Sequence, residues 1–240
     1  MKSIIIYGHR GAARYYPENT MISYEKAIEM GADGIEIDVH KSKDGHLIVC
    51  HDEKVDRTTN GSGYIKDLSL QELKNLDAGS WFSDKFKGER IPVLEEVLQF
   101  VKEKNVLLNI EIKSGPIFYH DIEEDIVNAI KAYNLEDRII ISSFNHYSLL
   151  KIKDIDKGLK TGILYIAGLA SPWEYARSVK ADAIHPLFMT IDRDVVLSCL
   201  ENGIQVNPFT VNEEWGLQLM KSFGVTSVIT DCPDLANNIL

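Results

Sequence analysis

The sequence predicts a (β/α)8 barrel that forms a single domain over residues 1–240. Short runs rich in β-branched residues alternate with longer segments of helical periodicity, which is typical of βαβ units around a parallel sheet. The length of 240 residues is common for an undivided barrel of this class. There are nine strand candidates, and one of them has a separate explanation, which leaves the eight that the barrel needs.

The strand candidates follow one another along the chain at 3–8, 34–40, 46–50, 106–112, 138–143, 160–165, 182–186, 203–208 and 226–230. Amphipathic segments between most of them predict helices at 20–30, 93–104, 119–133, 145–155, 172–179, 192–202 and 212–222. Residues that favour helix ends follow several of these segments, as at Gly31, Asn134 and Gly203.

The surplus strand is explained by a hairpin. An Asp-Gly pair at 44–45 lies between two β-rich arms, so 46–50 is expected to fold back on 34–40. A two-residue loop would place His51 directly opposite Asp38, and a longer bulged loop would shift this pairing by one residue. The hairpin therefore brings His51 close to Asp38.

Residues 53–91 interrupt the alternation and predict a small insertion after the hairpin. Turn-forming residues come first, followed by a short helix that Ser69 opens with Glu72 in capping-box spacing. An aromatic cluster completes the segment: Trp81, Phe82 and Phe86. Because these rings need a surface to pack on, the insertion is interpreted as part of the fold that could form one wall of a binding site.

The composition limits the classes of partner. A formal net charge of −10 argues against binding to nucleic acid and against stable association with an anionic membrane. The three cysteines are an odd number and lack metal-ligand spacing: Cys50, Cys199 and Cys232. They are interpreted as small buried hydrophobic residues in a protein from a reducing compartment. No run has the length of a signal-peptide core or a membrane-spanning helix, so a soluble, cytoplasmic protein is expected.

Strand periodicity gathers carboxylates at the carboxyl end of the predicted barrel. Glu36 and Asp38 share the inner face of one strand, whereas Ile37 faces the helices, and the same alternation turns Glu111 and Lys113 inward. Two carboxylates about 5 Å apart would repel by roughly 3 kcal/mol at an effective dielectric of ~20. A divalent cation would remove this repulsion, and oxygen ligands favour Mg²⁺ or Ca²⁺ over zinc.

Two histidines are expected to flank this cation. His9 ends the first strand and His51 follows the hairpin, and a base with an acid around a Lewis acid is suited to cleaving a phosphate ester. Arg10 and Lys113 would neutralise the phosphate oxygens. Each feature alone has a simpler interpretation, as a solvated edge, a core histidine or an internal ion pair, but their meeting at one end of a barrel favours a site.

The remaining histidines receive different interpretations. Four of them lie near the hairpin turn or at helix starts and are expected at the surface: His40, His46, His120 and His146. His185 ends a strand and is expected to face the pocket.

Short motifs follow one another along nearly the whole chain. They are His9-Arg10-Gly11, Pro17-Glu18-Asn19-Thr20, Gly31-Ala32-Asp33-Gly34-Ile35-Glu36-Ile37-Asp38-Val39, Lys43-Asp44-Gly45, His51-Asp52, Asp56-Arg57-Thr58-Thr59-Asn60-Gly61, Asn109-Ile110-Glu111-Ile112-Lys113, Asn207-Pro208-Phe209-Thr210-Val211-Asn212 and Ile229-Thr230-Asp231. In this order they strongly resemble the glycerophosphodiester phosphodiesterase family in its bacterial, single-domain form, and the resemblance includes the insertion at 53–91.

The resemblance implies metal-dependent hydrolysis of small glycerophosphodiesters, such as glycerophosphocholine and glycerophosphoethanolamine, to sn-glycerol 3-phosphate and an alcohol. It implies three groups of site residues: Glu36, Asp38 and Glu111 for one divalent cation, Mg²⁺ or Ca²⁺; His9 and His51 for acid-base catalysis; and Arg10 and Lys113 for phosphate. Phe209 stands where family members often have tryptophan, and it offers an apolar wall for substrate without the indole N–H donor. The protein is expected to be a monomer or a homodimer.

Neighbouring motif residues are given supporting roles. Asn19 or Thr20 is expected to start the first helix, with Glu18 in the loop before it. Asp52 is expected to orient His51 or its loop instead of binding metal.

Two further functions stay open. A lipid-directed phospholipase of the same barrel superfamily would need an apolar rim, and the acidic balance does not favour anionic membranes. The candidates for such a rim are Trp81, Phe82, Phe86, Phe118 and Tyr119. A catalytically silent glycerophosphodiester sensor would have no need for both histidines and all three carboxylates. A zinc amidohydrolase is disfavoured, because the first strand ends in His-Arg-Gly and lacks a pair of histidines.

Overall fold

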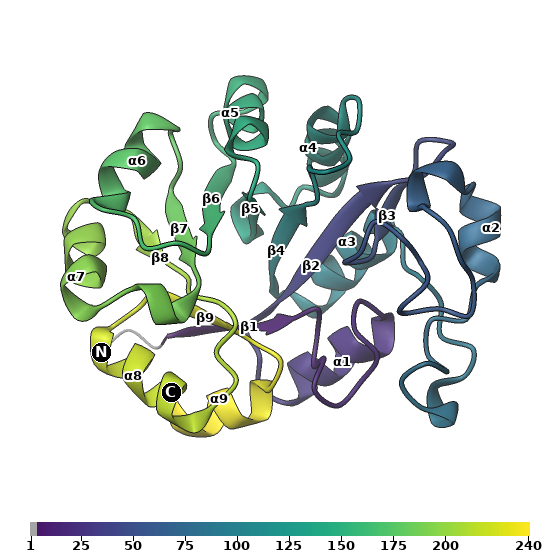
Figure 1. Cartoon of the computed structure of the whole chain (residues 1–240), viewed down its shortest axis with the longest axis horizontal. Helices are drawn as coiled ribbons and strands as arrows, with labels where there is room; N and C mark the ends of the chain where they lie inside the picture. The colour runs from purple at the N-terminus through teal and green to yellow at the C-terminus, as the bar shows by residue number, and fades with distance from the viewer. Residues whose placement is uncertain (1–3) are drawn as a thin grey trace.

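The computed structural model describes residues 4–240 and contains a parallel barrel surrounded by helices (Figure 1). Its strands are β1 (Ile5–His9), β2 (Gly34–Lys41), β4 (Leu107–Ile112), β5 (Ile139–Ser143), β6 (Lys160–Tyr165), β7 (Ala183–Pro186), β8 (Gln205–Val206) and β9 (Ser227–Thr230). Hydrogen bonds join them in the order β8-β7-β6-β5-β4-β2-β1-β9. Thr226 N donates to Val206 O at 2.9 Å, and Ile229 N donates to Pro208 O at 3.0 Å, which nearly closes the ring. The predicted fold class is confirmed.

The strands agree with the predicted segments to within a few residues. Residue 3, in the first predicted strand, lies outside the described residues. The largest difference is at β8, which covers two residues of the predicted 203–208. Gly203 has φ +76° and belongs to the turn after the preceding helix, and Pro208 has no N–H to donate to a neighbouring strand.

Helices pack around the outside of the barrel. They are α1 (Met21–Glu29), α3 (Leu94–Lys104), α4 (Ile122–Tyr133), α5 (His146–Ile155), α6 (Pro172–Ser178), α7 (Arg193–Glu201), α8 (Glu214–Phe223) and α9 (Pro233–Ile239), with short 3-10 helices at Glu136–Arg138 and Phe188–Thr190. Thr20 caps α1 by accepting a hydrogen bond from Ser23 N. Helix α9 lies outside the predicted segments, although Pro233 in its first turn is a typical helix start. Within residues 4–240, none of the helices is both long enough and apolar enough to cross a membrane.

The ninth strand, β3 (Leu47–Val49), pairs antiparallel with β2 and lies off the barrel, as predicted. Its register differs by one residue from the pairing expected for a two-residue loop. Gly45 has φ +91° and the loop contains three residues, so Asp38 lies opposite Cys50, whose N–H donates to Asp38 O at 3.0 Å. The prediction that His51 lies directly opposite Asp38 is therefore wrong.

The insertion at 53–91 packs beside the barrel, at the edge where Figure 1 labels α2 (Leu70–Asn75). Its other helical turns are the 3-10 helices Ile65–Asp67 and Asp84–Phe86. The predicted capping box of Ser69 is present at the start of α2. A small separate core holds the insertion together and consists of Ile48, Cys50, Val55, Ile65, Leu73, Ala78 and Ile91. The ring of Phe86 lies 5.5 Å from that of Tyr16, so the aromatic cluster packs on the segment before α1.

The register between β2 and β4 determines which side chains meet inside the barrel. Glu36 lies beside Asn109, and Asp38 lies beside Glu111, and side chains of paired residues point to the same face. Ile37, between the two acidic residues of β2, is fully buried in the main core on the opposite face. The alternation predicted for these strands is the one that the structure has.

Replacing Gly34 with alanine is expected to destabilise the protein. The new Cβ would lie 2.5 Å from the carbonyl oxygen of Leu107 in the neighbouring strand. Because sheet backbone cannot easily move aside, we expect a loss of about 1–3 kcal/mol, which thermal denaturation detects as about 2–4 °C per kcal/mol. Gly168→Ala is the control, since its nearest atom lies 3.9 Å away. Equal melting temperatures for the two variants would contradict this account.

Candidate active site

Polar side chains converge at the carboxyl ends of β1, β2 and β4, which is the end of a (β/α)8 barrel where active sites lie. A small cavity opens there. It is lined by His9, Glu36, Asn109, Glu111, Leu164, Phe209 and Ile229. The cavity therefore joins residues from five barrel strands and the loop after β8.

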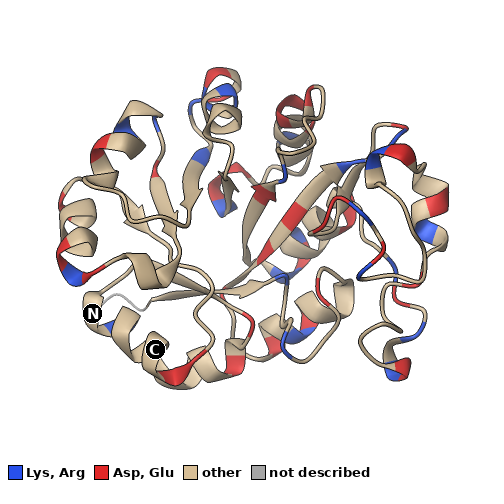
Figure 2. Cartoon of the chain, viewed as in Figure 1, with Lys and Arg blue, Asp and Glu red and all other residues tan. Residues whose placement is uncertain are grey.

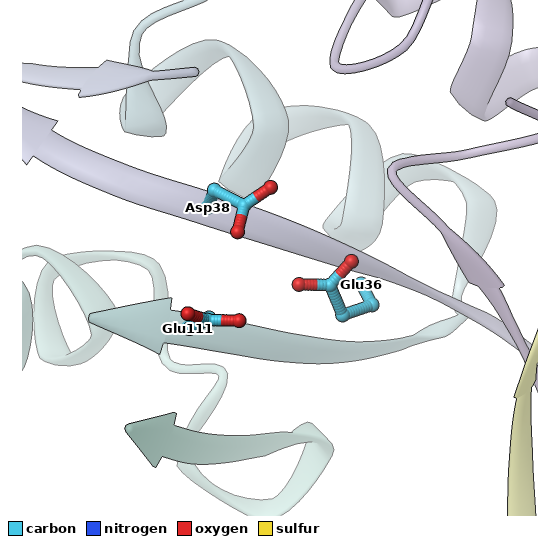
Figure 3. A group of neighbouring side chains, drawn as sticks. All are labelled: Glu36, Asp38 and Glu111. Carbon is cyan, nitrogen blue, oxygen red and sulfur yellow. The ribbon is translucent and has the colours of Figure 1, made fainter. Parts of the chain in front are cut away.

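Three carboxylates form the centre of this site. Glu36 and Asp38 lie on β2 and Glu111 lies on β4, and one oxygen from each falls within 4.8 Å of the others. Figure 3 shows the three carboxylates turned toward the same space between the two strands. Glu36 and Asp38 are buried, and the Glu111 side chain is only 13% exposed. The sequence-predicted ligand residues are thus brought together.

Neighbouring donors balance the charge of Asp38. Lys113 Nζ lies 3.4 Å from its Oδ1, Arg10 Nε lies 3.4 Å from its Oδ2, and Asn19 Nδ2 donates to Oδ2 at 2.8 Å. Burial alone would raise the pKa of Asp38, but Lys113 and Arg10 outweigh it and hold this pKa well below its usual range. Lys113 Nζ also donates to Glu111 Oε1 at 2.7 Å. Asp38 is therefore ionised.

The charge of Glu36 is less well compensated by neighbouring donors than that of Asp38. The N–H of Arg10 donates to its Oε2 at 3.0 Å, but burial and the neighbouring Asp38 raise the pKa of Glu36 to about 8. Burial also raises the pKa of Glu111, although Lys113 opposes the shift. Without a cation, the three carboxylates are therefore not all ionised at neutral pH. Buried oxygen ligands at this spacing fit a hard divalent cation.

His9 occupies the end of β1 beside the carboxylates. Its Nδ1 lies 2.6 Å from Asp231 Oδ1, and its Nε2 lies 4.0 Å from Glu36 Oε2. Burial lowers the pKa of His9, but the Asp231 hydrogen bond and Glu36 outweigh burial and raise it overall. Because an ionised carboxylate can only accept, Nδ1 carries a proton and Nε2 is left to exchange one in the cavity.

His51 is held in a similar way. Its Nδ1 donates to Asp52 Oδ1 at 2.7 Å, as expected for a residue that orients the ring. Arg57, in the insertion, donates to Asp52 Oδ2 at 2.7 Å and to Glu18 Oε2 at 2.7 Å. Nε2 is therefore the ring nitrogen of His51 that does not bond to Asp52.

Arg10 contacts the carboxylates from an unusual backbone conformation. Its φ of +52° lies in the left-handed region, and its carbonyl accepts from Asn19 N at 3.0 Å and from Ser23 Oγ at 3.1 Å. The side chain donates from Nη1 to Glu18 Oε1 at 2.9 Å. Among the described residues, the buried Nε of Arg10 has no hydrogen-bond partner. Glu18 and Asn19 therefore position site residues in addition to forming the loop before α1.

His40 is buried, so its predicted surface position is wrong. Its Nε2 donates to His51 O at 3.1 Å, and Tyr119 Oη donates to its Nδ1 at 2.9 Å. Burial lowers the pKa of His40 to about 4, so the ring is neutral. The alternation of Glu36 and Asp38, continued by two residues, places His40 on the same face and is the signal that could have found it.

Asp231 is a second residue whose contact with the site is not predicted. It follows β9 directly, and its N–H donates to Asn212 Oδ1 at 2.8 Å. Because β9 pairs with β1, a carboxylate at this position lies beside the end of β1 and reaches His9. The sequence feature that could have predicted this contact is the position of Asp231 directly after the last strand of the barrel.

Phe209 and His185 lie across the barrel from the three carboxylates. Phe209 lines the cavity and packs against Phe144, with ring centroids 6.0 Å apart. His185 is paired in register with Leu164, which lines the cavity, so its buried ring lies on the inner face of the barrel, but His185 is not among the residues that line the cavity. Asn207 Nδ2 donates to His185 Nε2 at 3.0 Å.

The other three histidines lie away from the carboxylates. His46 and His120 are exposed, as expected. His146 is partly buried, because its Nε2 donates to Leu164 O at 2.9 Å and its Nδ1 bonds to Tyr175 Oη at 2.8 Å. Its ring packs between α5 and α6.

Comparisons with known proteins agree on one family. The profile of the glycerophosphoryl diester phosphodiesterase family matches residues 9–235. A glycerophosphodiester phosphodiesterase of Caldanaerobacter subterraneus subsp. tengcongensis is 49% identical over 100% of this chain and 98% of its own length. One from Bacillus subtilis is 38% identical over 98% of this chain and 86% of its own length.

Solved structures give the same result. A glycerophosphodiester phosphodiesterase from Agrobacterium tumefaciens has a TM-score of 0.88 and 28% identity, with 99% of this chain and 100% of that chain covered. An Oleispira antarctica phosphodiesterase, in complex with the product sn-glycerol-3-phosphate, has a TM-score of 0.88 and 29% identity, with coverage of 98% and 96%. The resemblance seen in the sequence motifs is confirmed.

Replacing Tyr119 with phenylalanine is expected to loosen the contact between His40 and the His51 backbone. The change removes the hydroxyl that donates to His40 Nδ1, and a lost hydrogen bond of this kind contributes about 0.5–1.5 kcal/mol. Thermal or chemical denaturation measures the loss. Tyr147→Phe is the matched control, because Tyr147 is 82% exposed. If both variants were as stable as the parent protein, the hydroxyl of Tyr119 would have no such role.

Proposed function

Because the chain belongs to the glycerophosphoryl diester phosphodiesterase family and is thus a phosphoric diester hydrolase, we propose that it cleaves small glycerophosphodiesters. Its products are sn-glycerol 3-phosphate and an alcohol, and glycerophosphocholine and glycerophosphoethanolamine are representative substrates. The main support is the position of three buried carboxylates beside two imidazoles, each with its Nδ1 on an aspartate.

The carboxylates hold one divalent cation, Mg²⁺ or Ca²⁺. The ligand residues are Glu36, Asp38 and Glu111, and the support is that one oxygen from each lies within 4.8 Å of the others, where burial and the neighbouring Asp38 raise the pKa of Glu36. When bound, the cation supplies positive charge that polarises the phosphate group. Arg10 Nε and Lys113 Nζ lie beside the same carboxylates and donate to the phosphate oxygens.

His9 and His51 exchange the protons of the reaction through their Nε2 atoms. One imidazole accepts the proton of the attacking oxygen, which is either water or the glycerol 2-hydroxyl, and the other gives a proton to the alcohol oxygen as the bond from phosphorus to that oxygen breaks. If the 2-hydroxyl attacks, water then opens the cyclic phosphate to give sn-glycerol 3-phosphate. Asp231 and Asp52 keep the two rings in the tautomer that this exchange needs. Phe209 forms an apolar wall for the substrate.

The proposal also covers the class of substrate, the excluded partners, the cellular location and the oligomeric state. The product in the Oleispira antarctica structure supports a small-molecule substrate with a glycerol phosphate part. The net charge of −10 supports a partner other than nucleic acid or an anionic membrane. The three free, buried cysteines support a cytoplasmic location. The protein acts as a monomer or a homodimer.

Release of sn-glycerol 3-phosphate from glycerophosphoethanolamine is expected to stop after thorough chelation. It should return when Mg²⁺ or Ca²⁺ is added, and an enzyme-coupled assay for glycerol 3-phosphate measures both steps. Activity that persists fully in chelator, with no metal found by elemental analysis, would refute the need for a cation.

Glu111→Gln is expected to weaken binding of the active cation by at least about tenfold, since even residues behind a metal ligand change affinity by this much. Titration calorimetry measures the dissociation constant. Glu123→Gln is the control, because Glu123 is a buried carboxylate on α4 that pairs with Lys151. Unchanged affinity in Glu111→Gln would remove Glu111 from the ligand set.

His9→Gln and His51→Gln are each expected to fold normally and to lower kcat by about 10²–10⁴-fold, because each removes a proton-exchanging group. Steady-state kinetics on glycerophosphoethanolamine give the rate, and circular dichroism verifies the fold. His120→Gln is the control, since the His120 side chain is 94% exposed. Near-normal turnover by either variant would exclude that histidine from acid-base catalysis.

A further inference from the structure

The cavity has two chemically different sides. Its charged side contains His9 on β1 and Glu111 on β4, whereas its apolar side contains Leu164 on β6 and Phe209 after β8. In a ring of eight strands, those four places apart lie opposite each other, so β6 faces β1 and β8 faces β4. A substrate in the cavity therefore has the carboxylates and His9 on one side and hydrocarbon on the other.

The apolar side continues from the cavity to the surface. Phe209 packs against Phe144, which follows β5 and is 48% exposed, and Ile166, two residues after Leu164, is 64% exposed. Single exposed apolar residues are common and need no explanation. Phe144 is linked to the cavity by its contact with Phe209, and Ile166 by its place two residues after Leu164 in the chain. We call Phe144, Leu164, Ile166 and Phe209 the apolar wall.

The loops around the apolar wall contain no Lys or Arg, and their two acidic residues, Asp192 and Glu213, are exposed and lie at the starts of α7 and α8. The loops follow β5, β6, β7 and β8 at 144–145, 166–171, 187–192 and 207–213. By contrast, charged residues are frequent at 10–18 and 51–57, on the side of His51. Figure 2 shows the difference, since the connection after β6 is tan whereas red and blue segments are dense around β2 and the insertion.

We propose that the apolar wall binds the leaving alcohol and that it prefers an uncharged, apolar alcohol to a cationic one such as choline or ethanolamine. This inference rests on the proposed function. The glycerol phosphate part needs the polar donors of the charged side, so the alcohol extends toward the wall. An ammonium group packed against the four side chains of the apolar wall would lose water, and none of these four side chains is a carboxylate, whereas each methylene gains from burial.

A series of sn-glycero-3-phosphoalkanols tests the preference. The esters carry n-alkyl chains of two, four, six and eight carbons and are used at concentrations below those at which they form micelles. We expect kcat/KM to rise by about two- to fourfold per methylene over the first additions, as for burial of hydrocarbon. A second comparison uses glycerophosphocholine and its uncharged 3,3-dimethylbutyl isostere, and the isostere should be the better substrate.

Variants test whether the apolar wall causes the dependence of kcat/KM on chain length. Phe144→Ala and Ile166→Ser are expected to flatten the dependence on chain length, and Tyr147→Ala is the control. Tyr147 is also an exposed aromatic residue close to Phe144 in the chain, but it lines a groove with Tyr175 on the outside of the barrel. The control should retain the full slope.

The outcomes separate this inference from the proposed function. If glycerophosphocholine is cleaved and the alkyl series is flat, the apolar wall has no role in substrate choice and the inference fails alone. Preference for choline over its isostere would also overturn it, because the two phenylalanines would then act as a cation-binding pair. If none of the esters is cleaved in the presence of either cation, both the inference and the proposed function fail.

Discussion

Mutual repulsion among Glu36, Asp38 and Glu111 is the constraint around which the site is built. Charges of the same sign at such separations repel by several kcal/mol per pair in a partly buried setting. Lys113 and Arg10 offset this for Asp38, whereas burial and the neighbouring Asp38 raise the pKa of Glu36 to about 8. The protein's own donors therefore compensate only part of the negative charge that the three carboxylates would carry if all were ionised.

Ion pairs and hydrogen bonds extend from this cluster to the histidines by separate routes. Arg10 bonds to Glu18, which bonds to Arg57, and Arg57 in turn orients Asp52 beside His51. His9 depends on Asp231, which is fixed by the loop after β8. Because the two routes use different ends of the chain, the barrel must be nearly complete before both imidazoles are in place. The spatial relation between the two rings is therefore a property of the whole fold.

The sequence predicts the barrel and the central residues well, because both depend on alternation along strands. Glu36, Asp38 and Glu111 follow from counting by two, and their convergence follows from the parallel order of β2 and β4. Less was predictable where the geometry depends on loops. One extra loop residue before β3 shifts the hairpin register, and the burial of His40 requires Tyr119 from a loop distant in sequence to cover it. The contact of Asp231 with His9 likewise depends on closure of the ring.

The bond between Glu18 and Arg57 has a consequence for engineering this barrel. An insertion such as 53–91 is an attractive place to exchange segments between related proteins, since it packs around a small core apart from the main one, which it shares with Ile48 and Cys50. Its first residues, however, hold Asp52 and reach back to the loop before α1. A graft that begins after Arg57 keeps this connection, whereas one that begins at 53 severs it. The useful boundary for building chimaeras therefore lies several residues inside the apparent edge of the insertion.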